Sequence, residues 1–96
     1  MMANERYTNV WDALVDTPEE AENLRVRSQL LRAITHAVKG WELSQTEAAK
    51  RLGVTQPRLN DLLKGKIDKF SLDALVNLLS GADLTIEVEV KVRTAA

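Results

Sequence analysis

The sequence contains no cysteine and a single histidine, so disulfide bonds and thiol chemistry are excluded and the usual zinc sites nearly so. No apolar run approaches the roughly 20 residues that a membrane-spanning helix requires. The first ten residues, MMANERYTNV, also lack the apolar core of a signal peptide. These absences predict a chain that stays in the cytoplasm.

The groups that most enzymes use are also missing. The sequence has no glycine-rich loop of the kind that holds phosphates. Its only histidine, His36, falls on the polar side of a predicted helix, and its carboxylates are scattered over predicted solvent-facing positions. Because no nucleophile and base or metal cluster can be assembled from these residues, we expect no enzyme activity, no cofactor and no metal.

What is present suits one small domain. Ninety-six residues with 45% hydrophobic and 28% charged content can bury one modest core, to which dimerisation would add useful area. The net charge of −1 argues against general nucleic-acid binding. However, residues 44–70 contain six Lys or Arg and three Asp or Glu, a local charge of +3, whereas the segments on either side each carry −2. The positive charge is therefore concentrated on one part of the chain.

That part of the chain has the spacing of two short helices joined by a turn. The stretch from Ser44 to Lys66 reads SQTEAAKRLGVTQPRLNDLLKGK. Ser44 and Thr55 are predicted N-caps, and Gly53 can take the positive φ that the turn requires. The predicted apolar anchors are Ala48, Leu52, Val54, Leu59 and Leu62. The pattern indicates a helix-turn-helix, a unit whose second helix can enter the major groove of DNA.

Helices are predicted on both sides of this motif. Thr17 and Pro18 are typical of a helix start, and apolar residues then recur at helical spacing until Gly40, which is expected to end the helix. Trp41 and Leu43 in the connector are expected in the core. After the motif, Ser71 is predicted to cap a further helix, and Gly81 is predicted to stop it.

Residues 84–93, LTIEVEVKVR, alternate strictly between apolar and polar side chains, which predicts a strand with one buried face. Only a weak segment near Val10 could pair with it inside the chain. We therefore expect the strand to pair with the same strand of a second subunit about a two-fold axis, which would join two DNA-reading units. The predicted dimer interface is Leu84, Ile86, Val88, Val90 and Val92.

Three parts are predicted from these patterns. They are an N-terminal extension at residues 1–16, a helical helix-turn-helix DNA-binding domain at 17–83, and a C-terminal dimerisation strand and tail at 84–96. The apolar cluster Val10–Val15 in the extension is either a flap over the first helix or a docking element for a partner.

The motif resembles the Xre/Cro/cI class of bacterial and phage DNA-binding proteins. The resemblance lies in Gln45 and Gln56 at the start of the two motif helices and in the closing Leu-Leu-Lys-Gly-Lys at residues 62–66. It implies a mainly α fold of four to five helices, here with a C-terminal β-strand that pairs across a dimer. It also implies a sequence-specific transcriptional regulator that acts as a repressor.

Two further segments are similar to the HigA-like antitoxins of type II toxin–antitoxin systems. They are Val-Trp-Asp-Ala-Leu at residues 10–14 ahead of a long helix, and Phe-Ser-Leu-Asp at residues 70–73 ahead of a closing strand. The similarity implies an antitoxin that autoregulates its operon and holds a toxin in a complex. The implied partner is a RelE-like toxin, a ribosome-dependent mRNA interferase.

The outer side of the second motif helix is predicted to read bases. Gln56 and Asn60 can each address adenine, Arg58 can address guanine or a phosphate, and Pro57 can contribute shape or contact a thymine methyl. Asp61 would accept from cytosine N4, or else form an ion pair with Arg58 or Lys64 at helical spacing. The predicted phosphate contacts are Gln45, Thr46, Lys64, Lys66, Lys69 and Ser71.

Two other readings of the same features stay open. One is a phage- or plasmid-derived Cro/cI-like repressor that has no toxin. The other is a protein-interaction module that does not bind duplex DNA and uses its strand edge to join a partner's sheet.

Overall fold

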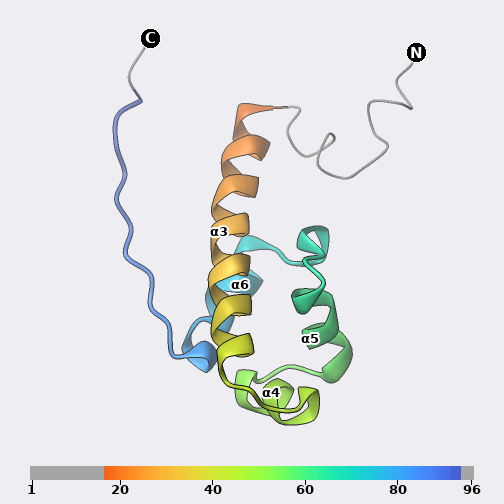
Figure 1. The fold of residues 1–96 in the computed structure, drawn as a ribbon. Coiled ribbons are helices and arrows are strands. Elements are labelled where there is room, and N and C mark those ends of the chain that lie inside the picture. Colours follow the sequence, from red (N-terminus) through yellow and green to blue (C-terminus); the bar gives the residue numbers. More distant parts are fainter. Residues whose placement is uncertain (1–16, 94–96) are drawn as a thin grey trace, which may run out of the picture.

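The computed structural model describes residues 17–93, a range that contains four α-helices and two short 3₁₀ turns. Figure 1 shows α3 as a long column with α4 at its C-terminal end, α5 beside it, and residues 84–93 running back along its other side. The mainly helical expectation is confirmed. The elements are α3 Pro18–Gly40, α4 Gln45–Leu52, α5 Gln56–Leu63, η1 Ile67–Lys69, α6 Leu72–Leu78 and η2 Ser80–Ala82. No helix within residues 17–93 is long and apolar enough to cross a membrane.

All four α-helices begin after a Ser or Thr whose side-chain oxygen accepts a backbone N–H from the first turn, at 3.1–3.3 Å. These bonds satisfy N–H groups that have no partner within the helix. The predicted N-caps are therefore confirmed, and they are Thr17, Ser44, Thr55 and Ser71.

The turns between helices use left-handed backbone. Gly53, with φ of 88°, separates α4 from α5 as predicted, and Gly65, with φ of 73°, follows α5. Helix α3 ends at Gly40 as predicted, but the left-handed residue lies further on. Gly40 is still helical, and Glu42, with φ of 57°, makes the left-handed turn. The connector changes direction there, and Leu43, expected in the core, is 40% exposed.

Gly81 has a different role from the predicted one. The helix before it, α6, ends at Leu78, and the left-handed residue is Asp83 with φ of 59°. A Cβ atom on Gly81 would lie 2.5 Å from the carbonyl oxygen of Leu52, the last residue of α4. Glycine is therefore required because η2 rests directly on the backbone at the end of α4.

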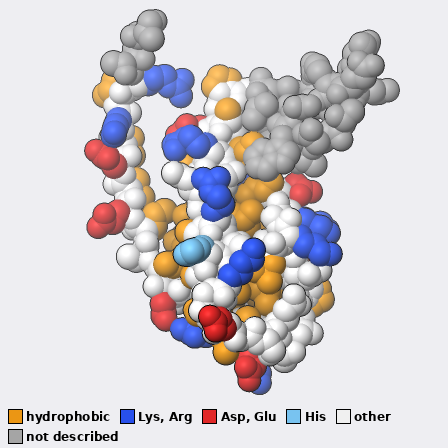
Figure 2. All heavy atoms as spheres, in the orientation of Figure 1, with side chains coloured by type: hydrophobic (Ala, Val, Ile, Leu, Met, Phe, Trp, Pro, Cys, Tyr) orange, Lys and Arg blue, Asp and Glu red, His pale blue; other side chains and the backbone are white. Residues whose placement is uncertain are grey.

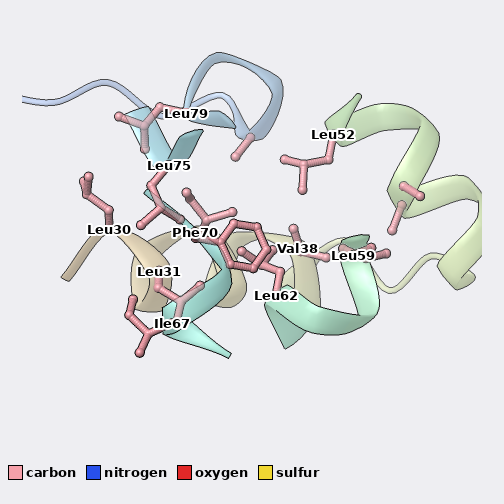
Figure 3. Packing of buried hydrophobic residues seen from close by; sticks show 14 of the residues in the cluster. Leu30, Leu31, Val38, Leu52, Leu59, Leu62, Ile67, Phe70, Leu75 and Leu79 are labelled. Carbon is pink, nitrogen blue, oxygen red and sulfur yellow. The ribbon is translucent and has the colours of Figure 1, made fainter. Parts of the chain in front are cut away.

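The core lies where α3 meets α5, η1 and α6, while α4 packs against α5 and η2. In Figure 3 the ring of Phe70 occupies the middle of this core, beside Val38 and Leu62. The largest fully buried side chains are Ile34, Leu59, Leu62, Phe70 and Leu75. Burial of the leucines fixes α5 with one side against α3, which leaves its opposite side toward solvent.

Residues 84–93 contain no assigned strand, so the predicted strand and its pairing across a dimer stay predictions. A strand needs hydrogen-bonded neighbours, and one described chain supplies none here. Leu84 packs against the core, but exposure then rises along the segment, from 41% at Ile86 to 75% at Val88, 88% at Val90 and 95% at Val92. The extension before Thr17 and the cluster Val10–Val15 lie outside the described residues.

Candidate nucleic-acid interface

The predicted reading residues divide between the outward side of α5 and its half-buried flanks. Leu59 and Leu62 are 0% and 1% exposed and hold the helix in place. Gln56 and Pro57 in the first turn are exposed, as is Lys64 at the C-cap. The half-buried flanks of this side are Arg58, Asn60 and Asp61. A helix held this way can present hydrogen-bonding side chains to a groove without disturbing its packing.

A side-chain hydrogen bond links the starts of the two motif helices. Nε2 of Gln56 donates to Oγ1 of Thr46 at 2.6 Å, and both residues are exposed. Thr46 keeps its hydroxyl proton for another acceptor, and Gln56 keeps its amide oxygen and second N–H. Gln45, beside Thr46 at the first position of α4, is also exposed. The predicted base contact Gln56 and two of the predicted phosphate contacts, Gln45 and Thr46, therefore lie together at one edge of the motif.

Arg58 is turned toward the chain that follows α5. Its Nη1 donates to the carbonyl oxygen of Lys69 at 2.8 Å, and its guanidinium carbon lies 4.0 Å from the centre of the Phe70 ring. A guanidinium can do both at once because it is planar and carries several donors. The role predicted for Arg58 toward guanine or phosphate stays a prediction, and this geometry does not display it.

Asp61 pairs with a residue that sequence spacing did not indicate. Its Oδ1 lies 3.6 Å from Nζ of Lys66, and its carbonyl oxygen accepts from the backbone N–H of Lys66 at 3.1 Å. The expected partners, Arg58 or Lys64, are wrong because the left-handed turn at Gly65 brings Lys66 back over the end of α5. The pair reduces the unfavourable effect of a carboxylate on a surface that would face phosphates.

Arg27 is a structural residue that sequence reasoning missed. It lies on α3 and is only 8% exposed. Its Nε donates to Oδ1 of Asn23 at 2.6 Å, and its Nη1 donates to the carbonyl oxygens of Ile67 and Phe70, both at 3.1 Å. A buried charge is tolerated when it is fully hydrogen-bonded. Its position three residues after Leu24, within the apolar stripe of α3, was the signal that could have found it.

The cationic side chains differ in what holds them. The guanidinium carbon of Arg51 in α4 lies 4.2 Å from the centre of the Trp41 ring. Its Nη2 lies 3.4 Å from Oδ2 of Asp83, so Arg51 contacts the residue that follows η2. Lys64 and Lys69 are exposed and form no ion pair within residues 17–93. Figure 2 shows Lys and Arg side chains along α3 and gathered over the end of α5 and η1.

A shallow hollow of about 450 Å³ separates α3 from α5 on this face. Its floor is apolar, from Leu31, Leu62 and Leu63, and its rim includes Arg32 and Lys39. Within residues 17–93 no three His, Asp or Glu side chains lie close enough together to bind a metal ion.

Comparison with known proteins agrees with this geometry. A family model described as a helix-turn-helix domain matches residues 13–91. A solved structure described as an XRE family transcriptional regulator is 32% identical, and the match covers 80% of this chain and 91% of that chain with a TM-score of 0.70. No curated protein matches the sequence.

Proposed function

The chain belongs to the helix-turn-helix domain family that it matches over residues 13–91, and we propose that it is a sequence-specific DNA-binding transcriptional regulator. The observation that carries the proposal is the outward side of α5. Gln56, Pro57 and Lys64 face solvent while Leu59 and Leu62 anchor the opposite side. This is the arrangement that a recognition helix requires in order to enter a major groove.

Binding begins with phosphates in this proposal. The exposed first turn of α4 offers backbone N–H groups with Gln45 and Thr46, and the other end of α5 offers Lys64, Lys66 and Lys69. These groups lie at the two ends of α5, so they would contact the DNA phosphates on either side of one groove. Each phosphate contact steepens the salt dependence of binding by roughly 0.9 in log–log slope.

The DNA sequence is then read by the side chains of α5 between these phosphate contacts. Gln56 and Asn60 present amides that suit adenine, and Pro57 supplies an apolar contact for a thymine methyl. Asp61 is held by Lys66, so it contributes to discrimination only where a cytosine amino group can compete for its carboxylate.

We further propose that two copies pair through residues 84–93 and bind a palindromic operator as a homodimer. Three alternate positions carry valines, Val88, Val90 and Val92, whose side chains are 75–95% exposed. This exposure is unfavourable for a single chain in water. Pairing with the same segment of a second copy would satisfy the backbone and cover these side chains.

The resemblance to HigA-like antitoxins supports a narrower proposal. The protein would repress its own promoter and hold a RelE-like toxin, acting as a cytoplasmic, non-enzymatic antitoxin. Purification of the tagged protein from its native host tests this step. Recovery of a stoichiometric toxin-sized protein encoded by the neighbouring gene is expected, and its absence would favour a repressor that has no toxin.

A gel shift on the protein's own upstream DNA tests the main proposal. We expect a shift that weakens steeply between low and moderate salt and is reduced by Lys64→Ala combined with Lys69→Ala. Arg32→Ala combined with Lys39→Ala, on α3, is the charge-matched control. The absence of any shift at low salt would leave the second candidate, an interaction module. The exposed valines of residues 84–93 are the observation that favours that candidate.

A further inference from the structure

Two arginines from different helices hold the turn between α5 and α6. Arg27 of α3 donates to the carbonyl oxygens of Ile67 and Phe70, and Arg58 of α5 donates to that of Lys69. Arg58 also covers the Phe70 ring. Three carbonyl groups of this short stretch therefore accept hydrogen bonds from guanidinium groups. We refer to residues 66–70 as the arginine-held turn.

The arginine-held turn carries two of the proposed phosphate contacts. Lys66 and Lys69 both have exposed side chains, although Lys66 also reaches Asp61. The backbone of Lys69 is fixed by Arg58 through its carbonyl and by its own N–H, which donates to Lys66 at 3.0 Å. The position of the Lys69 ammonium group relative to α5 thus depends on a contact that Arg58 supplies, whereas Lys66 is held to α5 by Asp61.

We propose that Arg58 is a positioning residue for DNA binding and not a reader of bases. It fixes the arginine-held turn against α5, so that Lys69 faces the phosphates beside the groove that α5 enters. The inference rests on the proposed function. Because the turn is already ordered in the free protein, DNA binding loses less conformational entropy.

The two contacts of Arg58 use two properties that arginine combines in one side chain. One edge of the guanidinium donates to the carbonyl of Lys69 while its flat face lies on the Phe70 ring. An ammonium group could donate to the carbonyl but has no planar face with which to cover the ring. Methionine could cover the ring but has no donor for the carbonyl.

Salt-dependent binding separates the possible roles of Arg58. The probes are a duplex selected in vitro by the wild-type protein and a duplex of scrambled sequence. In Arg58→Met we expect both affinities to fall by the same factor. We also expect the log–log slope to drop by about 0.9 per subunit, because the Lys69 contact is lost although Lys69 itself is unchanged. Arg58→Lys should not restore the slope, and the control Lys64→Ala should lower it by about 0.9.

Amide hydrogen exchange supplies the second readout. Exchange at Lys69 and Phe70 should be faster in Arg58→Met than in the wild-type protein, while amides within α4 stay unchanged.

Three results would overturn the inference. Loss of the preference for the selected duplex, with unchanged binding to the scrambled one, would make Arg58 a base reader. A slope change of about 0.9 that Arg58→Lys restores would make it a direct phosphate contact. An unchanged slope with only a lower melting temperature would limit it to stability. If the wild-type protein bound neither duplex, the proposed function itself would fail, an outcome distinct from all three.

Discussion

The helical body, residues 17–83, and the tail segment, residues 84–93, differ in how far their apolar side chains are buried. In the helical body Ile34, Leu59 and Leu75 are completely buried, and every α-helix start is capped. In the tail segment Val90 is 88% exposed and Val92 95%. Most apolar side chains of the helical body are covered by contacts within that body, whereas the valines of the tail segment are open to solvent.

This difference indicates a division of roles. A body that packs by itself can hold the outward side of α5 rigidly, which sequence reading requires. A tail with exposed alternating valines can join two such bodies without altering the reading side. The following variants test whether the two regions are as independent as this division requires.

The largest effect is expected from truncating a core side chain. Leu75→Ala should lower the free energy of unfolding by about 2–5 kcal/mol, because a fully buried leucine is lost and a cavity remains. Val90→Ala in the tail segment should change it by less than about 0.5 kcal/mol. Urea denaturation at low protein concentration measures both. Equal destabilisation by the two variants would show that the tail segment belongs to the core.

Val88→Asp should act on association and leave the helical body intact. Placing a carboxylate in an apolar pairing face removes about 1.5–3 kcal/mol of side-chain burial per site, equivalent to at least tenfold in the dimer dissociation constant. Sedimentation across a concentration series measures this, and Glu87→Gln, on the other face of the predicted strand, is the control. A Val88→Asp protein that remains as dimeric as the wild type would refute pairing through this face.

Two glycines of the helical body provide a matched pair of smaller effect. Gly81→Ala should destabilise by about 1–3 kcal/mol because its Cβ would lie 2.5 Å from the Leu52 carbonyl oxygen. Gly40→Ala, with nothing within 4 Å of the added Cβ, should be neutral or stabilising by up to about 1 kcal/mol. Thermal unfolding of the two variants decides. If Gly81→Ala melted like Gly40→Ala, the close contact between η2 and α4 would be wrong.

The smallest expected effect lies where the tail segment passes the start of α3. The guanidinium of Arg25 donates to the carboxylate of Glu22 at 2.6 Å. This hydrogen bond is the largest cause that lowers the pKa of Glu22 below its ordinary value, and the charge of Arg25 is the next. The charge of Arg93 in the tail segment lowers the pKa by a smaller amount. Because the folded-state pKa is depressed, the stabilisation is complete above the ordinary carboxyl pKa and is lost as the pH falls through the lowered value.

An NMR titration of the Glu22 carboxyl carbon measures this pKa. Arg25→Gln should return it toward its ordinary value, and Arg93→Gln should raise it slightly. No change on replacing Arg93 would mean that the tail segment does not lie alongside α3 in solution.

Local signals in the sequence were enough to predict most of the helical body. Cap residues such as Ser44, the helical spacing of the leucines and the positive φ at Gly53 depend on nearby residues alone, and each was confirmed. The roles of Arg27 and Gly81 depend on backbone more than 25 residues away in the chain. Sequence spacing carries no information about such contacts until the fold is known.

The candidate site divides in the same way. Exposure of Gln56 and Pro57 followed from the helical wheel, because the buried leucines fix the opposite side. The wheel could not show that Arg58 turns toward Phe70 or that Asp61 meets Lys66, since both partners lie beyond the end of α5. Pairing of the tail segment stays a prediction, because the structure describes a single chain.

In vitro selection of DNA by the wild-type protein and by Gln56→Ala tests most directly the claim that the outward side of α5 reads sequence. We expect the wild-type protein to enrich an inverted repeat. Gln56→Ala should lose about 1–3 kcal/mol of discrimination at one position of each half-site while it binds scrambled duplex as before. Failure of the wild-type protein to enrich any sequence, or an identical preference in Gln56→Ala, would contradict the account.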